Sequence, residues 1–207
     1  MYLFRLDFVD CSLSAFLSFW AKCYDDGKYP DSGYENNLSR GRKLTKENIR
    51  PLLEWKNGKE LSSHKRPFVE RVICNLEKFN EFRSLSEVKE GDMKKFWDIV
   101  CRIVKSGLVW RVFLLHVARP NDYPIFDQHV LRAQTYIETV QITAPKITLE
   151  YYESSYIPFF RCVCQTSAQE SRQVDKALMA FGQFLKSQFF KSDLLAETQS
   201  KLNFTLT

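Results

Sequence analysis

Asp127 is the residue of this sequence whose type and position are best suited to chemistry. It follows the proline-containing segment ARPNDYPIF and precedes QHVLRAQTYIETV, whose apolar residues recur at helical spacing. An aspartate at the start of a helix can cap the first turn, which is worth about 1 kcal/mol of stability. A carboxylate fixed there can also oppose a developing positive charge and orient or deprotonate a water molecule. From this residue alone, the cap is the favoured interpretation, and only the surrounding pattern can favour catalysis.

Lys105, Ser106 and Gly107 form a second candidate site. Small residues with exposed backbone amides can bind a phosphate group without any particular side chain. Lys105 before the turn and Arg111 after it add positive charge. The alternative interpretation is that Gly107 only ends a helix in the left-handed conformation.

The six cysteines are scattered along the chain, at positions 11, 23, 74, 101, 162 and 164. Their apolar surroundings, such as DIVCRIV, predict reduced thiols in the core rather than a disulfide framework. Cys162 and Cys164 could supply two metal ligands, but no second pair and no histidine lie near them in the sequence. We therefore expect no metal site, no metal cluster and no cofactor.

Helices must position these candidate residues. Glycine and proline together account for 14 of 207 residues, too few for the tight turns of a sheet-rich fold, and 44% of the residues are apolar. The spacing of apolar residues predicts helices over 12–24, 46–55, 66–82, 93–105, 108–118, 128–140, 148–157 and 171–190. The segment 108–118, LVWRVFLLHVA, is almost wholly apolar and is expected to be a central helix. The predicted fold class is all-α.

Charge and hydropathy narrow the possible partners. Lysine and arginine exceed aspartate and glutamate by five, a mild excess that is compatible with a polyanionic partner. No apolar run reaches the roughly 18 residues of a membrane span. The first ten residues carry acids where a signal peptide would be uninterrupted and apolar. We expect a soluble, cytoplasmic protein that does not bind membranes.

The segment from Lys105 to Arg132 has a distinctive order: a helix end, a glycine-bearing turn, an apolar helix, a proline-containing loop and an aspartate at the head of another helix. In this order it resembles the helix-hairpin-helix DNA glycosylase superfamily, of the endonuclease-three and adenine-glycosylase type. The closest local likeness is FDQHVLRA, from Phe126 to Ala133, because several of those enzymes carry their active-site aspartate in a similar run. The usual Leu-Pro-Gly-x-Gly turn is shortened here to Lys-Ser-Gly.

This resemblance implies a function and roles for particular residues. Asp127 would be the catalytic carboxylate in hydrolysis of the N-glycosidic bond of a flipped-out nucleotide in DNA. Valine at position 109, where strand-cutting members carry a lysine, implies a monofunctional enzyme that forms no Schiff base. The residues implied to contact DNA are Lys105, Ser106, Gly107, Arg111, Tyr123 and His129.

The resemblance also implies an all-α, two-lobed helical bundle with a shortened helix-hairpin-helix. Residues 44–130 would form the helical bundle that carries the turn. Residues 1–43 and 131–207 would together form the second lobe, and a cleft between the lobes would hold Asp127.

Further aromatic and basic residues could extend the DNA interface. Tyr29, Tyr34 and Trp110 could stack on a base, although Trp110 fits a core position better. Two short basic runs could follow a phosphate backbone or be solvated faces: Arg40, Arg42 and Lys43, and His64, Lys65 and Arg66.

Two alternatives to an active glycosylase stay open. The shortened turn and Val109 fit a non-catalytic relative that binds nucleic acid. The same scaffold could also be a helical domain that binds another protein.

Overall fold

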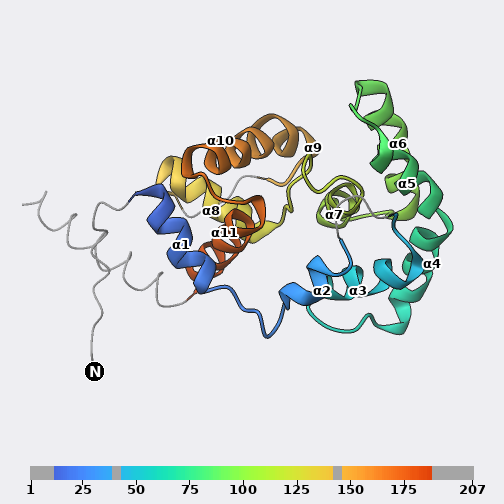
Figure 1. Ribbon diagram of the computed structural model, residues 1–207, viewed down its shortest axis with the longest axis horizontal. Coiled ribbons are helices and arrows are strands. Elements are labelled where there is room, and N and C mark those ends of the chain that lie inside the picture. Colours follow the sequence, from blue (N-terminus) through green and yellow to red (C-terminus); the bar gives the residue numbers. More distant parts are fainter. Residues whose placement is uncertain (1–11, 39–42, 142–145, 188–207) are drawn as a thin grey trace, which may run out of the picture. The chain divides into compact units, whose positions relative to one another are not determined.

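The computed structural model describes residues 12–38, 43–141 and 146–187, and within these ranges the regular structure is helical, with no strand (Figure 1). The all-α class predicted from the sequence is therefore confirmed. The chain divides into two compact units. The middle unit is Asp25–Phe126, and the terminal unit combines Met1–Tyr24 with Asp127–Thr207. The domain borders expected from the sequence, after residues 43 and 130, stay a prediction.

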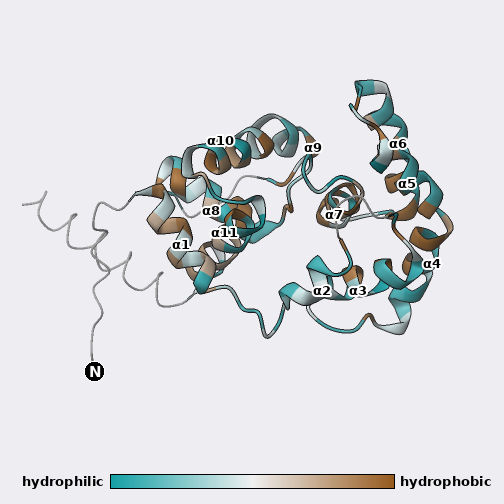
Figure 2. Cartoon of the chain, in the orientation of Figure 1, coloured by the Kyte–Doolittle hydropathy of each residue, from teal (hydrophilic) through white to brown (hydrophobic). Residues whose placement is uncertain are grey.

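The middle unit is built from short helices around α7. Its helices are α2 (Asp31–Glu35), α3 (Lys46–Asn57), the 3-10 turn η1 (Ser63–Lys65), α4 (Arg66–Cys74), α5 (Leu76–Ser84), α6 (Glu90–Ile103) and α7 (Leu108–Ala118). Helix α7 is apolar along most of its length, and residues 112–118 are all buried (Figure 2). Phe79 and Phe82 of α5 pack their rings on Phe96 of α6. The expected central helix is thus buried within its own unit.

The terminal unit brings together helices from both ends of the chain. It contains α1 (Leu13–Lys22), α8 (Gln128–Thr139), α9 (Leu149–Tyr151), the π-helical turn η2 (Tyr152–Tyr156), α10 (Ile157–Ser167) and α11 (Ser171–Lys186). Helix α11 packs against both α8 and α1 (Figure 1). Phe181 of α11 contacts the rings of Phe16 and Trp20 on α1 and of Tyr136 on α8. Phe181 is buried in the core of the unit, whereas the other three rings are partly exposed.

Several helix boundaries differ from the sequence prediction. The single helix expected over 66–82 is two helices, α4 and α5, separated at Asn75, whose side-chain amide donates to the Arg71 carbonyl. The segment 148–157 is not one α-helix, because a π-helical turn lies between α9 and α10. Helix α6 begins at Glu90, and its Asp92 carboxylate accepts from the Lys89 amide at 3.3 Å.

The cysteines differ from the expected core thiols. Cys23, Cys74 and Cys162 are exposed, and Cys101 and Cys164 are partly exposed. All five are free thiols, and Cys11 lies outside the described residues.

Among the described helices, none is long and apolar enough to cross a membrane.

Candidate functional site

Asp127 lies immediately before α8 and caps it. Its Oδ1 accepts hydrogen bonds from the backbone amides of His129, at 2.8 Å, and Val130, at 3.3 Å. The residue is only 8% exposed, and its backbone is extended. The partial positive charge of the helix N-terminus favours an ionised carboxylate at this position. The structure thus fixes one Asp127 oxygen and the orientation of the side chain.

Helix α11 holds the first turn of α8 through a very close backbone approach at Gly182. A Cβ atom built on Gly182 would lie 1.9 Å from the His129 carbonyl oxygen. The Gly182 carbonyl in turn accepts a hydrogen bond from Arg132 Nη1 at 3.1 Å. No residue larger than glycine fits here without moving the backbone next to Asp127, because real Cβ atoms do not approach other atoms this closely.

His129 is half-buried between Asp127 and Arg132. Burial lowers the pKa of its imidazole, and the nearby Asp127 carboxylate only partly opposes this effect. Arg132 Nη1 lies 3.4 Å from His129 Nδ1, a distance that suits a weak hydrogen bond in which Nδ1 accepts. The geometry favours a neutral imidazole, which can orient a ligand but adds little attraction for a phosphate.

A second buried carboxylate lies in the same unit as Asp127. Asp175 of α11 is paired with Arg172 and is 7% exposed. Tyr156 is fully buried, and its pKa is raised well above the ordinary value by burial first and then by the charges of Asp175 and Asp127. The phenol therefore stays protonated close to both carboxylates. Nothing in the local sequence around Tyr156 or Asp175 indicates this cluster, because Tyr156 lies in η2 and Asp175 lies in α11.

The predicted phosphate-binding turn connects α6 to α7 in the middle unit. Lys105, Ser106 and Gly107 are all exposed. Gly107 has a φ of +94°, which strongly favours glycine, and the space where a Cβ would stand is open. Gly107 lies directly before α7, whereas α6 already ends at Ile103, so it does not act as the residue that terminates α6.

Two arginines hold the end of α6 beside this turn. Arg111 donates from Nε to the Val104 carbonyl at 2.9 Å and from Nη2 to the Lys105 carbonyl at 2.7 Å. Arg71, which the sequence analysis missed, donates from Nε to the Ile103 carbonyl at 3.0 Å. Their positive charges suit the negative end of the helix dipole. Arg111 therefore has a structural role at the turn whatever else it binds.

Other basic residues gather at the same turn. Lys65 Nζ lies 4.9 Å from the centre of the Trp110 ring, so the second basic run predicted from the sequence meets the start of α7. Trp110 itself is half-buried against Phe68. We call the following residues the turn basic group: Lys65, Arg71, Arg102, Lys105 and Arg111. His64 and Arg66, next to Lys65 in the sequence, are both exposed.

Tyr123 belongs to a hydrogen-bonded network around His116 in the middle unit. The Tyr123 carbonyl can only accept, so the 2.8 Å distance assigns the proton to His116 Nδ1. His116 Nε2 then accepts from the Tyr34 hydroxyl at 2.6 Å. The Tyr123 ring stacks on Phe82, and the Tyr34 ring packs against Trp55. Both tyrosines therefore have structural contacts in addition to any role toward bases.

The remaining candidates are less informative. Tyr29 is half-buried with its ring against Trp55. Lys43 is exposed, whereas Arg40 and Arg42 lie outside the described residues.

Among the residues whose placement is described, no three histidine, cysteine, aspartate or glutamate side chains form a group that could hold a metal ion. Comparison of the chain with protein-family models, with curated proteins and with solved structures gave no match.

Proposed function

We propose that this protein is a DNA N-glycosylase-like enzyme that removes a base by hydrolysis, with Asp127 as its catalytic carboxylate. The observation that carries the proposal is the Asp127 side chain, which two backbone amides hold at the head of α8. This aspartate stands in the run Phe126–Ala133, which resembles the active-site run of helix-hairpin-helix glycosylases. Metals and cofactors have no part in the proposed reaction.

The chemistry follows from the charge that develops during bond cleavage. As the bond between the sugar C1′ and the base nitrogen lengthens, positive charge builds on the sugar, and the Asp127 carboxylate opposes it. Water then supplies hydroxide to C1′, and its proton leaves with Asp127 or with the departing base. The neutral His129 imidazole, with its lowered pKa, could orient the water or the nucleotide.

The turn basic group is the proposed binding surface for the DNA backbone. Lys105, Ser106 and Gly107 are exposed at the turn. Arg71 and Arg111 bind carbonyl groups at the end of α6, Lys65 lies over the Trp110 ring, and Arg102 belongs to the last turn of α6. Lysine and arginine side chains that bind phosphates release counterions, so binding should weaken steeply with salt. Duplex DNA with an abasic-site analogue, measured at two salt concentrations, is the direct test of this surface.

The test of catalysis is Asp127→Asn. Asparagine caps a helix about as well as aspartate, so the fold should be retained. Excision from duplexes that carry damaged or mispaired bases should fall by orders of magnitude, because the charge that opposes the sugar cation is removed. Asp98→Asn, an exposed position on α6, is the matched control and should retain full activity. Full excision by Asp127→Asn would refute the assignment, and an adduct trapped by borohydride would refute the monofunctional mechanism.

The turn basic group and Val109 also favour a second candidate function, a nucleic-acid-binding relative without catalysis. It predicts salt-dependent DNA binding by the wild-type protein and no excision of any base. In that case Asp127→Asn would leave binding unchanged, and Asp127→Ala would cost only the stability of a cap, about 1 kcal/mol. If the protein does not bind DNA at all, both of these functions are refuted, and the remaining alternative is a helical domain that binds another protein.

A further inference from the structure

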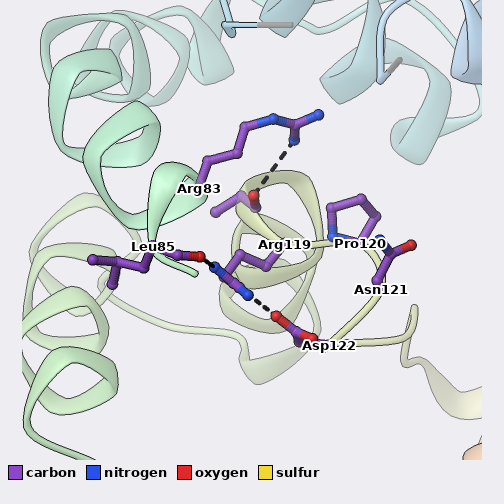
Figure 3. Close-up of a pocket in the computed structure, with 7 residues that line it drawn as sticks. Arg83, Leu85, Arg119, Pro120, Asn121 and Asp122 are labelled. Carbon is purple, nitrogen blue, oxygen red and sulfur yellow. Dashed lines mark hydrogen bonds and ion pairs between the residues drawn. The ribbon is translucent and has the colours of Figure 1, made fainter. Parts of the chain in front are cut away.

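The middle unit contains a small pocket (Figure 3), and none of its lining residues belongs to the turn basic group. It has a volume of about 210 Å³ and is formed by the end of α5, the end of α7 and the loop that follows α7. Its lining residues are Arg83, Leu85, Ala118, Arg119, Pro120, Asn121 and Asp122.

Hydrogen bonds fix the two arginines of the pocket. Arg83 Nη1 donates to the carbonyls of Val117, at 2.9 Å, and Ala118, at 3.4 Å. Figure 3 shows Arg119 between the Leu85 carbonyl and the Asp122 carboxylate, and Arg119 Nη1 donates to that carbonyl at 2.5 Å. Each guanidinium thus binds the chain near the end of a helix, so its position is set before any ligand arrives.

The charges of the lining select the kind of ligand. Two guanidinium groups and one carboxylate leave an excess of one positive charge. Arginine stays protonated in proteins, and burial, which lowers the pKa of Arg83, also makes its charge less screened by water. The planar guanidinium matches the spacing of two oxygens on a phosphate or carboxylate. Asn121 adds an amide that can donate a further hydrogen bond.

The size of the pocket limits the ligand further. Sites for whole cofactors or drug-sized molecules usually measure about 300–1,000 Å³. This pocket is smaller, so it has room for one anionic group and little else.

We propose that the pocket binds a single phosphate group, with Arg83 as the main charged ligand-binding residue. Such a group could belong to a DNA strand or to a small phosphorylated molecule, and the chemistry of recognition is the same. The proposal does not depend on Asp127 or on base excision. A phosphate held there would link the end of α5 to the loop 119–122, which leads within five residues to Asp127.

Inorganic phosphate is the probe for this site. We expect calorimetry to give a dissociation constant in the millimolar range, and we expect phosphate to raise the melting temperature above that in chloride of the same ionic strength. Arg83→Lys keeps the charge but removes the planar fork, so phosphate affinity should fall at least tenfold. Arg50→Lys, at an exposed arginine of the same unit that pairs with Glu70, is the matched control and should bind as the wild type does.

A second variant keeps the proposal testable if Arg83→Lys is unstable. Asn121→Asp adds a negative charge at an exposed lining position and should also weaken phosphate binding, whereas Asn36→Asp on the exposed end of α2 should not. Equal binding by the wild type and both pocket variants, or equal effects of chloride and phosphate, would overturn the proposal. If the ligand is a DNA phosphate, both pocket variants also weaken duplex binding. If it is a small molecule, duplex binding stays unchanged while phosphate binding falls.

Discussion

The two units of the molecule differ sharply in charge. The middle unit, residues 25–126, has 20 lysines and arginines against 15 aspartates and glutamates, whereas the rest of the chain has ten of each. The entire net charge of +5 therefore belongs to the middle unit. A polyanion would be attracted to this half of the chain, and the neutral half would contribute little to long-range attraction.

The two units also differ in their buried charged residues, and here it is the terminal unit that has more. Asp127, Asp175 and Lys176 are buried in the terminal unit, while His116 is the buried polar residue of the middle unit within the described ranges. Buried charges are costly unless they are paired, so natural proteins retain them where packing or function requires them. The excess positive charge and the buried charged side chains therefore belong to separate units of the chain.

The largest expected effect on this comparison is the loss of stability when Gly182 of the terminal unit is replaced. Gly182→Ala places a methyl group against the His129 backbone and should cost about 3 kcal/mol, which is roughly 6–12 °C in melting temperature. Gly91→Ala in α6 of the middle unit meets no atom within 4 Å and should be neutral or slightly stabilising. Thermal unfolding of both variants checks the prediction. Equal stability of the two would show that α8 and α11 are packed less tightly than described.

A smaller effect is expected from two exposed charges of the turn basic group. The double variant Lys105→Gln, Arg102→Gln should weaken duplex DNA binding several-fold and reduce the salt dependence by about one unit of slope for each phosphate that the variant no longer binds. Lys22→Gln, Arg161→Gln removes the same net charge from exposed positions of the terminal unit and is the control. Equal weakening in both would mean that the middle unit holds no special binding surface.

The smallest effect is the pH dependence of stability in the terminal unit. The pKa of His129 is lowered by burial, so the unfolded chain takes up a proton more readily than the folded one. The stability that depends on a neutral His129 is fully present above the ordinary pKa of histidine, about 6.5. It is lost as the pH falls through the lower pKa of His129 in the folded protein. Melting temperatures measured between pH 7.5 and 5 should fall less in His129→Gln than in the wild type. An identical pH dependence would contradict the neutral, buried imidazole.

The helical class is predictable because it rests on local signals. Apolar spacing locates α7 and α11, and Asp127 has the residue type and position of the cap of α8. The break at Asn75 is missed because an asparagine inside an amphipathic pattern does not by itself end a helix. The π-helical turn over Tyr152–Tyr156 is missed for a similar reason, since its residues also fit an α-helix.

The candidate site is only partly predictable, because its supporting interactions join distant segments. Arg71 reaches the end of α6 across 32 residues of sequence, and no local pattern indicates that hydrogen bond. Gly182 fits the pattern of an ordinary helix residue, although a glycine inside a strong amphipathic helix is the one signal that could suggest a close helix packing. The assignment of Asp127 to catalysis and of the turn to DNA stays a prediction.

The connectivity of the units determines the order in which they can be completed during synthesis. The middle unit is one continuous stretch, so all its residues are available once Phe126 has been made. Helix α1 must wait for its partner α11 until α11 has left the ribosome. Gln169, two residues before α11, donates a hydrogen bond to Ser14 over 155 residues of sequence. During that interval the aromatic face of α1, with Phe16 and Trp20, has no α11 to cover it. The nascent chain would therefore be prone to aggregation or chaperone binding through α1.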